Sequence, residues 1–239
     1  MTIDIVPITA SDFRLAPGAW PMPAEIRAKV PGIWAEVVAK NPHVWDGRIL
    51  GFTPPVLDGE GVFRSEARED SYSAFLAWRA LGFPDIGTVH IFGTTLIESA
   101  DGALIFGVMG GKTINAGRVY PPGGALEPRD VRADGVVDAE TCIATELHEE
   151  TGLRMEDGRA GQLLAIVDGP RIAIARRLSF DLSAEALVAR IHANLAAQDD
   201  PELSDVVACR KAADGEAAGD LAPYARVVLD AFAAGRLWV

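Results

Sequence analysis

The chain has 239 residues, 49% of them hydrophobic, and its 34 acidic and 22 basic side chains give a formal charge of −12. A chain of this length and composition can bury a core of its own, and its negative charge excludes nonspecific attraction to nucleic acid or to an anionic membrane. Two cysteines are too few for a disulfide framework. Without a basic leader or an apolar run long enough to cross a bilayer, the chain is expected to be cytoplasmic.

Residues 1–85 are rich in proline and tryptophan and carry no catalytic motif. Helical patterns over residues 23–40 and 67–81 flank the run WDGRILGF, which predicts an N-terminal α+β extension. Its tryptophans are expected to pack rather than to stack on nucleic-acid bases, because the charge around them is not basic. These are Trp20, Trp34, Trp45 and Trp78. Three roles remain open for the extension: a lid over a substrate pocket, packing, or a homodimer contact.

From residue 88 the pattern changes to strands. TVHIFGTTLIES, ALIFGVM and GRVYPP are separated by turn residues, and a helix beginning at Asp138 follows them. Strands QLLAIVDG and RIAIARRLSF, a helix over residues 184–197, a strand DVVACR and a last helix PYARVVLDAFAAG complete the chain, while AADGEAAGD is expected to be a loop. We therefore predict a second domain of mixed α/β class over residues 86–239.

The run ATELHEETGL places three carboxylates on neighbouring positions of the predicted helix, where like charges repel. They belong to Glu146, Glu149 and Glu150. Asp138 can cap the start of this helix, and Gly152 can end it in the left-handed conformation. Three converging carboxylates suit a hard cation such as Mg²⁺, which takes oxygen ligands and keeps waters that substrate phosphates can replace. Hydrolysis of a diphosphate is the chemistry that such a site favours.

Several residues of this region fall on the pattern E-U-x-E-E-x-G-U, where U is aliphatic: Glu146, Leu147, Glu149, Glu150, Gly152 and Leu153. Upstream, Gly123, Gly124 and Glu127 match a PGG-x-x-E opening. Together they resemble the box of the Nudix (MutT-like) hydrolases, G-x5-E-x7-R-E-U-x-E-E-x-G-U. The resemblance implies an α/β/α sandwich with a mixed sheet. It also implies hydrolysis, with Mg²⁺ or Mn²⁺, of the diphosphate linkage between a nucleoside diphosphate and another group X, as in a nucleotide sugar or dinucleotide.

The same resemblance assigns roles within the site. Glu149 and Glu150 are the first choice as metal ligands, and Glu146 as a ligand or as the base that takes a proton from water. Substrate contacts are expected from four residues: Lys112, Arg118, Gly123 and Gly124. A base from the acidic stretch DDPELSD is the alternative, although an exposed loop is the favoured interpretation there; its acids are Asp199, Asp200, Glu202 and Asp205. Cys142 is expected to pack beneath the site, since a thiol is too soft for Mg²⁺.

Two positions depart from the family pattern: Thr145 stands where the family has arginine, and Val137 where it has glutamate. That arginine orients the neighbouring glutamate through charge-assisted hydrogen bonds, which a threonine cannot replace. Three other arginines are candidates to substitute for it: Arg118, Arg129 and Arg132. The departures leave open a nucleotide-binding or sensor protein with weak or no hydrolase activity. A structural module in which the acids are simply solvated is a third class.

Overall fold

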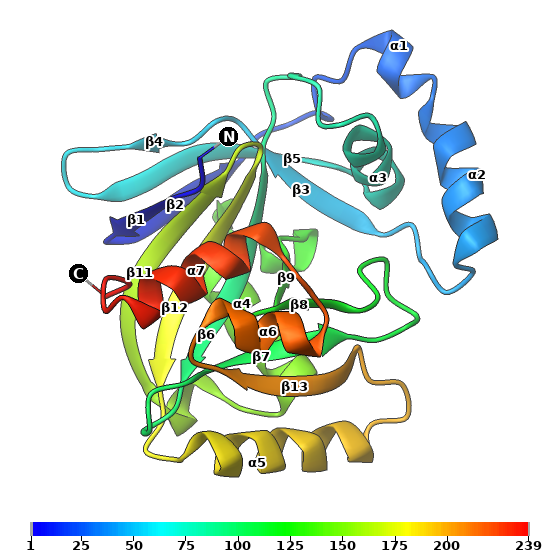
Figure 1. Ribbon diagram of the computed structural model, residues 1–239. Coiled ribbons are helices and arrows are strands. Elements are labelled where there is room, and N and C mark those ends of the chain that lie inside the picture. Colours follow the sequence, from blue (N-terminus) through cyan, green and yellow to red (C-terminus); the bar gives the residue numbers. More distant parts are fainter. Residues whose placement is uncertain (1, 239) are drawn as a thin grey trace.

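The computed structural model describes residues 2–238, which form a nine-stranded mixed sheet between two layers of helices and a smaller five-stranded sheet beside it (Figure 1). The predicted mixed α/β sandwich with an N-terminal α+β extension is therefore confirmed. None of the helices in this described range combines the length and the apolar character that crossing a membrane requires.

The large sheet contains strands from near both ends of the chain. Its strands run in the order β1 (Asp4–Ile8), β11 (Arg159–Asp168), β12 (Arg171–Ser179), β6 (His90–Glu98), β7 (Leu104–Met109), β8 (Arg118–Tyr120) and β14 (Asp220–Leu221). Two further strands lie off this path: β13 (Leu203–Cys209) pairs with β7, and β9 (Gly123–Ala125) pairs with β6. Because β1 pairs antiparallel with β11, the extension contributes an edge strand to this sheet. The division near residue 85 stays a prediction.

Side chains alternate between the two faces of the sheet, as strand geometry requires. On β6, Ile91 and Ile97 pack on the side of α4 (Ala139–Thr151) and α5 (Ala184–Ala197), whereas Leu96 packs on the side of α7 (Pro223–Ala233). Strand β7 is buried at every position, which matches its unbroken apolar sequence. The sheet is thus covered on both faces, with α4 behind it and α7 in front in Figure 1.

The predicted loop over residues 212–220 is wrong, because residues Ala212–Ala218 form helix α6. Asp214 accepts hydrogen bonds from the backbone N–H groups of Arg210 and Lys211, at 2.7 and 3.1 Å, which fixes the first turn. Ala212 is buried in the core, and Leu221 closes over Gly215. Alanine-rich sequence supports a helix, and tertiary packing decides between helix and loop here.

The smaller sheet comes mainly from the extension. It contains β10 (Val136–Val137), β2 (Ala10–Leu15), β5 (Val62–Ser71), β3 (Arg48–Phe52) and β4 (Val56–Leu57), and it is accompanied by α1 (Ala24–Arg27), α2 (Val30–Lys40) and α3 (Tyr72–Ala80). The helix expected over residues 67–81 is wrong at its start, because Ala67 and Asp70 lie buried on β5. The hydroxyl of Ser71 then accepts a hydrogen bond from the Ala74 N–H and begins α3.

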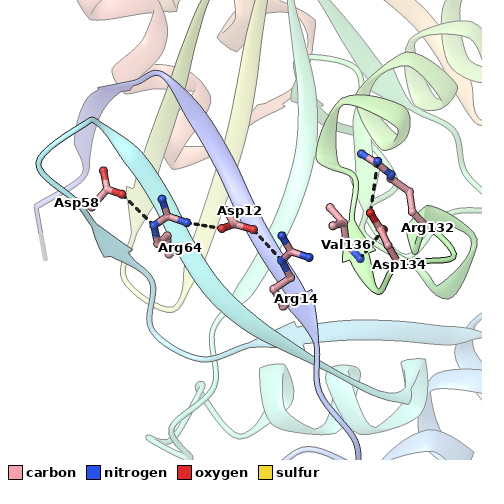
Figure 2. A network of polar contacts seen from close by, with 7 residues as sticks. All are labelled: Asp12, Arg14, Asp58, Arg64, Arg132, Asp134 and Val136. Carbon is pink, nitrogen blue, oxygen red and sulfur yellow. Dashed lines mark hydrogen bonds and ion pairs between the residues drawn. The ribbon is translucent and has the colours of Figure 1, made fainter.

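Ion pairs tie the exposed surface of this sheet together. Arg64 on β5 pairs with Asp58, at 2.9 Å, and with Asp12 on β2, and Asp12 also accepts a hydrogen bond from Arg14 (Figure 2). All four side chains are partly exposed, so each pair contributes little to stability.

The helices of the extension are anchored by a buried carboxylate. Asp70 is 4% exposed and accepts two hydrogen bonds from the Arg27 guanidinium, at 2.7 and 2.8 Å. Beside it, Trp20 and Trp78 pack edge to face with their rings 5.8 Å apart. Packing is thus confirmed for these two tryptophans, whereas Trp45 is 79% exposed and was wrongly expected to pack.

Candidate active site

Helix α4 is fixed at both ends by the residues that the sequence predicts. Asp138 Oδ1 accepts hydrogen bonds from the N–H groups of Glu140 and Thr141, at 3.1 and 3.2 Å, and Gly152 ends the helix with φ +70°. The helix packs closely on β6, since a Cβ placed on Gly93 would lie 3.1 Å from Cys142 Sγ. Cys142 is 1% exposed, so its expected place beneath the site is confirmed.

Strand β9 meets the carboxylates of α4 directly. Glu150 Oε2 accepts a hydrogen bond from the Gly123 N–H at 2.8 Å. A Cβ on Gly124 would lie 2.5 Å from Glu146 Cδ, and one on Gly123 would lie 2.2 Å from the Gly93 carbonyl oxygen. Gly123 has no room for a side chain, because backbone atoms lie against it, whereas a side chain at Gly124 would displace the Glu146 carboxylate. The close approach places both carboxylates against β9.

The three box glutamates on α4 differ in environment. Glu146 and Glu150 are 8% and 2% exposed, whereas the Glu149 side chain is 55% exposed. Burial raises the pKa of Glu146 to about 7, against the influence of Arg129. Burial also raises the pKa of Glu150 well above its usual range, and the charges of Glu202 and Glu146 add to this effect. The site therefore holds buried carboxylates that repel one another.

Two more glutamates join this cluster. Burial raises the pKa of Glu127, and that of Glu202 is raised by desolvation and then by the charge of Glu149. The Glu202 side chain is exposed at the mouth of a cavity, yet its charge acts on Glu146 and Glu150. Sequence reasoning favoured a plain exposed loop here. Gly110 approaches this loop closely, since a Cβ built on Gly110 would lie 2.8 Å from the Glu202 carbonyl oxygen. This contact brings the loop to the site.

Arg129 is the cation at the centre of the glutamates. It lies on the 3₁₀ turn η1 (Pro128–Asp130), and its Nη2 donates to Glu146 Oε1 at 2.8 Å. Its Nη1 lies 3.3 Å from Glu149 Oε1 and its Nε lies 3.3 Å from Glu127 Oε2. Three arginines were candidates to substitute for the family arginine. Of these, Arg129 contacts Glu146, the glutamate that this arginine orients in the family pattern.

The other two candidates point elsewhere. Arg118 Nε lies 3.3 Å from Asp220 Oδ2, on the neighbouring strand β14. Arg132 pairs with Asp134 within its own turn, at 3.5 Å, and both side chains are exposed (Figure 2).

Asp130 is a residue of the site that sequence reasoning missed. It is 3% exposed, and its Oδ2 accepts a hydrogen bond from the Glu127 N–H at 2.8 Å. Burial raises the pKa of this carboxyl. Asp130 follows Gly124 at the G-x5-acid spacing of the family pattern, ahead of a longer connection to α4. That spacing was the available signal, and the structure shows that Asp130 holds the turn that presents Arg129.

A cavity of about 460 Å³ opens in front of β9. Gly123, Gly124, Arg118 and Lys112 all line it, so the four expected substrate contacts are brought together. Lys112 lies at the mouth, where its Nζ is 2.7 Å from Asp200 Oδ1 and both side chains are exposed. Residues of the extension, among them Tyr72 and Arg79, form part of the opposite wall.

The glutamates match a divalent cation in chemistry but not as an assembled site. All their donor atoms are hard oxygens, and the repulsion that raises the pKa values of Glu146 and Glu150 is the kind that a cation relieves. Among residues 2–238, however, no three acidic, histidine or cysteine side chains lie together closely enough to hold an ion. Arg129 stands between the carboxylates.

Comparisons with known proteins give matches in structure only. No family model matches the chain, and no curated protein matches it in sequence. Among solved structures, a MutT protein from Methanosarcina mazei is 18% identical, with 62% of this chain and 94% of that chain covered and a TM-score of 0.40. A Nudix hydrolase from Nitrosomonas europaea is 13% identical, with 62% and 90% covered and a TM-score of 0.39.

A pyrophosphohydrolase from Bacillus subtilis is 12% identical, with 69% of this chain and 77% of that chain covered and a TM-score of 0.32. The three structures are thus described as a MutT protein, a Nudix hydrolase and a pyrophosphohydrolase, and each is under 20% identical to this chain.

Proposed function

We propose that the protein is a Nudix-type pyrophosphohydrolase that cleaves, with Mg²⁺ or Mn²⁺, the diphosphate linkage of a nucleoside diphosphate joined to another group X. One observation carries the proposal: Glu146 and Glu150, both buried and with raised pKa values, contact the Gly123–Gly124 strand, and these two glycines line a cavity together with Glu202. Buried carboxylates that repel one another destabilise a fold, and this arrangement is typical of functional sites.

We assign ligand, base and positioning roles to the residues of this site. Glu149 and Glu150, with Glu146 as a third ligand or as the base, would hold the cation, which when bound would polarise phosphoryl oxygens and neutralise developing charge. In the second of these roles, Glu146 would take a proton from the attacking water. Arg129 keeps Glu146 and Glu149 in position.

A second candidate is a protein that binds a nucleotide without cleaving it. It is favoured by Arg129, which pairs with three of the glutamates and so neutralises part of the charge that a cation would neutralise. In that case the cavity would bind a nucleoside diphosphate compound, and the carboxylates would have a structural role beside it.

Product analysis separates these candidates. Purified protein is incubated with nucleotide sugars, dinucleotides, coenzyme A and nucleoside triphosphates, with Mg²⁺ or with chelator, and the products are identified by mass spectrometry. The proposal predicts metal-dependent formation of a nucleoside monophosphate and a phosphorylated X. Calorimetric binding of one of these compounds without any product over hours would instead establish the binding protein.

A further inference from the structure

Three arginines from distant parts of the chain meet on the cavity wall formed partly by the extension. They are Arg79 on α3, Arg118 on β8 and Arg171 on β12. Arg118 and Arg171 act on the pKa of Arg79, which burial and their like charges lower. A cluster of three guanidinium groups inside a cavity is costly in a protein unless negative charge is supplied there. The whole chain carries a net charge of −12, so general excess of basic residues does not explain the cluster.

The protein itself neutralises only two of these charges. Arg171 pairs with Asp168, and Arg118 lies 3.3 Å from Asp220, whose side chain is 72% exposed. Within residues 2–238, Arg79 has no carboxylate at ion-pair distance, and its Nη1 donates to the neutral Asn115 Oδ1 at 3.0 Å. An arginine with a purely structural role would be expected to have a carboxylate partner in such a half-buried place.

His90 adds an unsatisfied polar group to the same wall. It is 8% exposed, and its ring lies 4.4 Å from that of Phe75 and 5.6 Å from that of Phe92. Its Nδ1 has no hydrogen-bond partner in the described chain. Burial, with the charges of Arg171 and Arg79, lowers its pKa to about 3, so the ring is neutral at physiological pH. A buried ring nitrogen without a partner costs stability and can be satisfied by a ligand.

Two tyrosines line the cavity beside the arginines. Tyr120 and Tyr224 are 6.4 Å apart between ring centres, and the charges of Glu150 and Arg118 act in opposite directions on the pKa of both phenols. The β9 glycines that contact Glu146 and Glu150 line the same cavity as the three arginines. A bound molecule of diphosphate type could therefore contact the arginines and lie beside β9.

We propose that Arg79, Arg118 and Arg171, together with His90, form an oxyanion subsite that binds a phosphate or carboxylate group of the substrate. That the bound anion is part of the substrate rests on the proposed function, whereas the existence of the anion site does not. Guanidinium groups bind such oxyanions through paired charge-assisted hydrogen bonds, and the neutral imidazole can donate one more. Since Arg79 belongs to α3, the extension is a wall of the binding site, which favours the lid among its three open roles.

Anion binding is tested without catalysis. Pyrophosphate is titrated calorimetrically into the full-length protein in metal-free buffer, with inorganic phosphate as a second probe. Binding to the wild type is expected, with affinity about tenfold weaker in Arg79→Gln, because one charged hydrogen-bonding partner is lost. Arg159→Gln, which changes a side chain that is 79% exposed, is the matched control and should bind as the wild type does. Absence of binding by the wild type, or equal affinity in Arg79→Gln, would overturn the subsite.

A second variant tests the subsite even if Arg79→Gln does not fold. Asn115→Asp keeps the size of the side chain and gives Arg79 an internal carboxylate in place of the amide that it contacts at 3.0 Å. This variant should weaken pyrophosphate binding while all three arginines remain. Unchanged pyrophosphate affinity in Asn115→Asp would again contradict the subsite.

Turnover measurements then show which part of the substrate occupies the subsite, the cleaved diphosphate or group X. With a dinucleotide that does or does not carry an additional ribose phosphate, Arg79→Gln should lower kcat/KM equally for both if the cleaved diphosphate occupies the subsite. A loss confined to the phosphorylated dinucleotide would instead assign the subsite to group X, and no loss on either would refute it. Pyrophosphate binding that depends on Arg79, without hydrolysis of any compound, would leave the subsite standing and reject the proposed function.

Discussion

Arg129 Nη2 donates a hydrogen bond to Glu146 Oε1 across 2.8 Å, although seventeen positions separate the two residues in the chain. In the family pattern the arginine directly precedes this glutamate, where the present chain has Thr145. The guanidinium here comes instead from the η1 turn, which Asp130 holds in place.

Replacing Arg129 should therefore impair turnover. Arg129→Gln removes the charged partner of Glu146 and Glu149 and is expected to lower kcat/KM roughly 10- to 100-fold, the usual effect of removing a group that orients a catalytic ligand. Arg132→Gln is the control, because Arg132 lies nearby but pairs with Asp134 in its own turn. Equal activity of both variants would show that Arg129 does not position the glutamates.

The converse substitution follows from the same geometry. Thr145→Arg restores the family residue and would raise turnover if orientation of Glu146 limited it. With Arg129 already bound to Glu146, we expect steady-state kinetics to show no gain. A several-fold increase in kcat would mean that Arg129 substitutes poorly for the missing arginine.

A side chain at Gly124 should displace the Glu146 carboxylate. In Gly124→Ala the new Cβ would stand 2.5 Å from Glu146 Cδ, so the carboxylate has to move away from β9. We expect a stability loss of about 1–3 kcal/mol in urea unfolding and a loss of activity near 100-fold, since catalytic groups act only when well placed. Gly111→Ala, at a position with open space around the Cβ, is the control. Wild-type kinetics in Gly124→Ala would contradict the close packing of Glu146 on this strand.

The buried carboxylate of the extension should matter for stability. Asp70→Asn weakens the pairing with Arg27 and is expected to cost about 2–3 kcal/mol of unfolding free energy, as for a buried charged hydrogen bond. Hydrogen bonds from Arg27 and Ser71 lower the pKa of Asp70 in spite of its burial. This stabilisation is present above the unfolded-state pKa and is lost as the pH falls through the lower folded-state pKa. Glu69→Gln, in an exposed pair with Arg48, should cost under about 0.5 kcal/mol.

His90 should make the fold sensitive to acid. Its folded-state pKa of about 3 lies below the ordinary value of 6.5, so the unfolded chain binds the proton first. Stability is highest above pH 6.5 and is lost as the pH falls toward 3, by about 2 kcal/mol at pH 5. Urea unfolding of His90→Phe should lack this part of the decline, whereas the exposed His192→Phe should retain it. Parallel pH profiles for His90→Phe and wild type would contradict the buried neutral state.

Sequence pattern predicted the parts of this molecule that depend on local regularity. The helix carrying Glu146, Glu149 and Glu150 has both its predicted cap, Asp138, and its predicted end, Gly152, because capping chemistry acts within a few residues. The strands of the large sheet were visible as apolar runs, since both faces of that sheet are buried.

What escaped prediction depends on contacts between distant segments. Helix α6 forms because Ala212 and Gly215 pack against the core, and the start of the 67–81 segment is a strand because β3 and β2 pair with it. The choice of Arg129 over Arg118 and Arg132 likewise depends on how η1 folds onto α4. Neither periodicity nor spacing carries that information.

The most direct test of the central claim compares two glutamate variants. Turnover of the substrate found by product analysis is measured across a Mg²⁺ titration for wild type, Glu150→Gln and Glu156→Gln, the last changing a glutamate whose side chain is 72% exposed. The proposed site predicts that Glu150→Gln loses about 100-fold or more at every Mg²⁺ concentration, since a metal-assisted step is worth several kcal/mol, while Glu156→Gln follows the wild type. Full turnover in a folded Glu150→Gln variant would contradict the assignment of this carboxylate cluster as the active site.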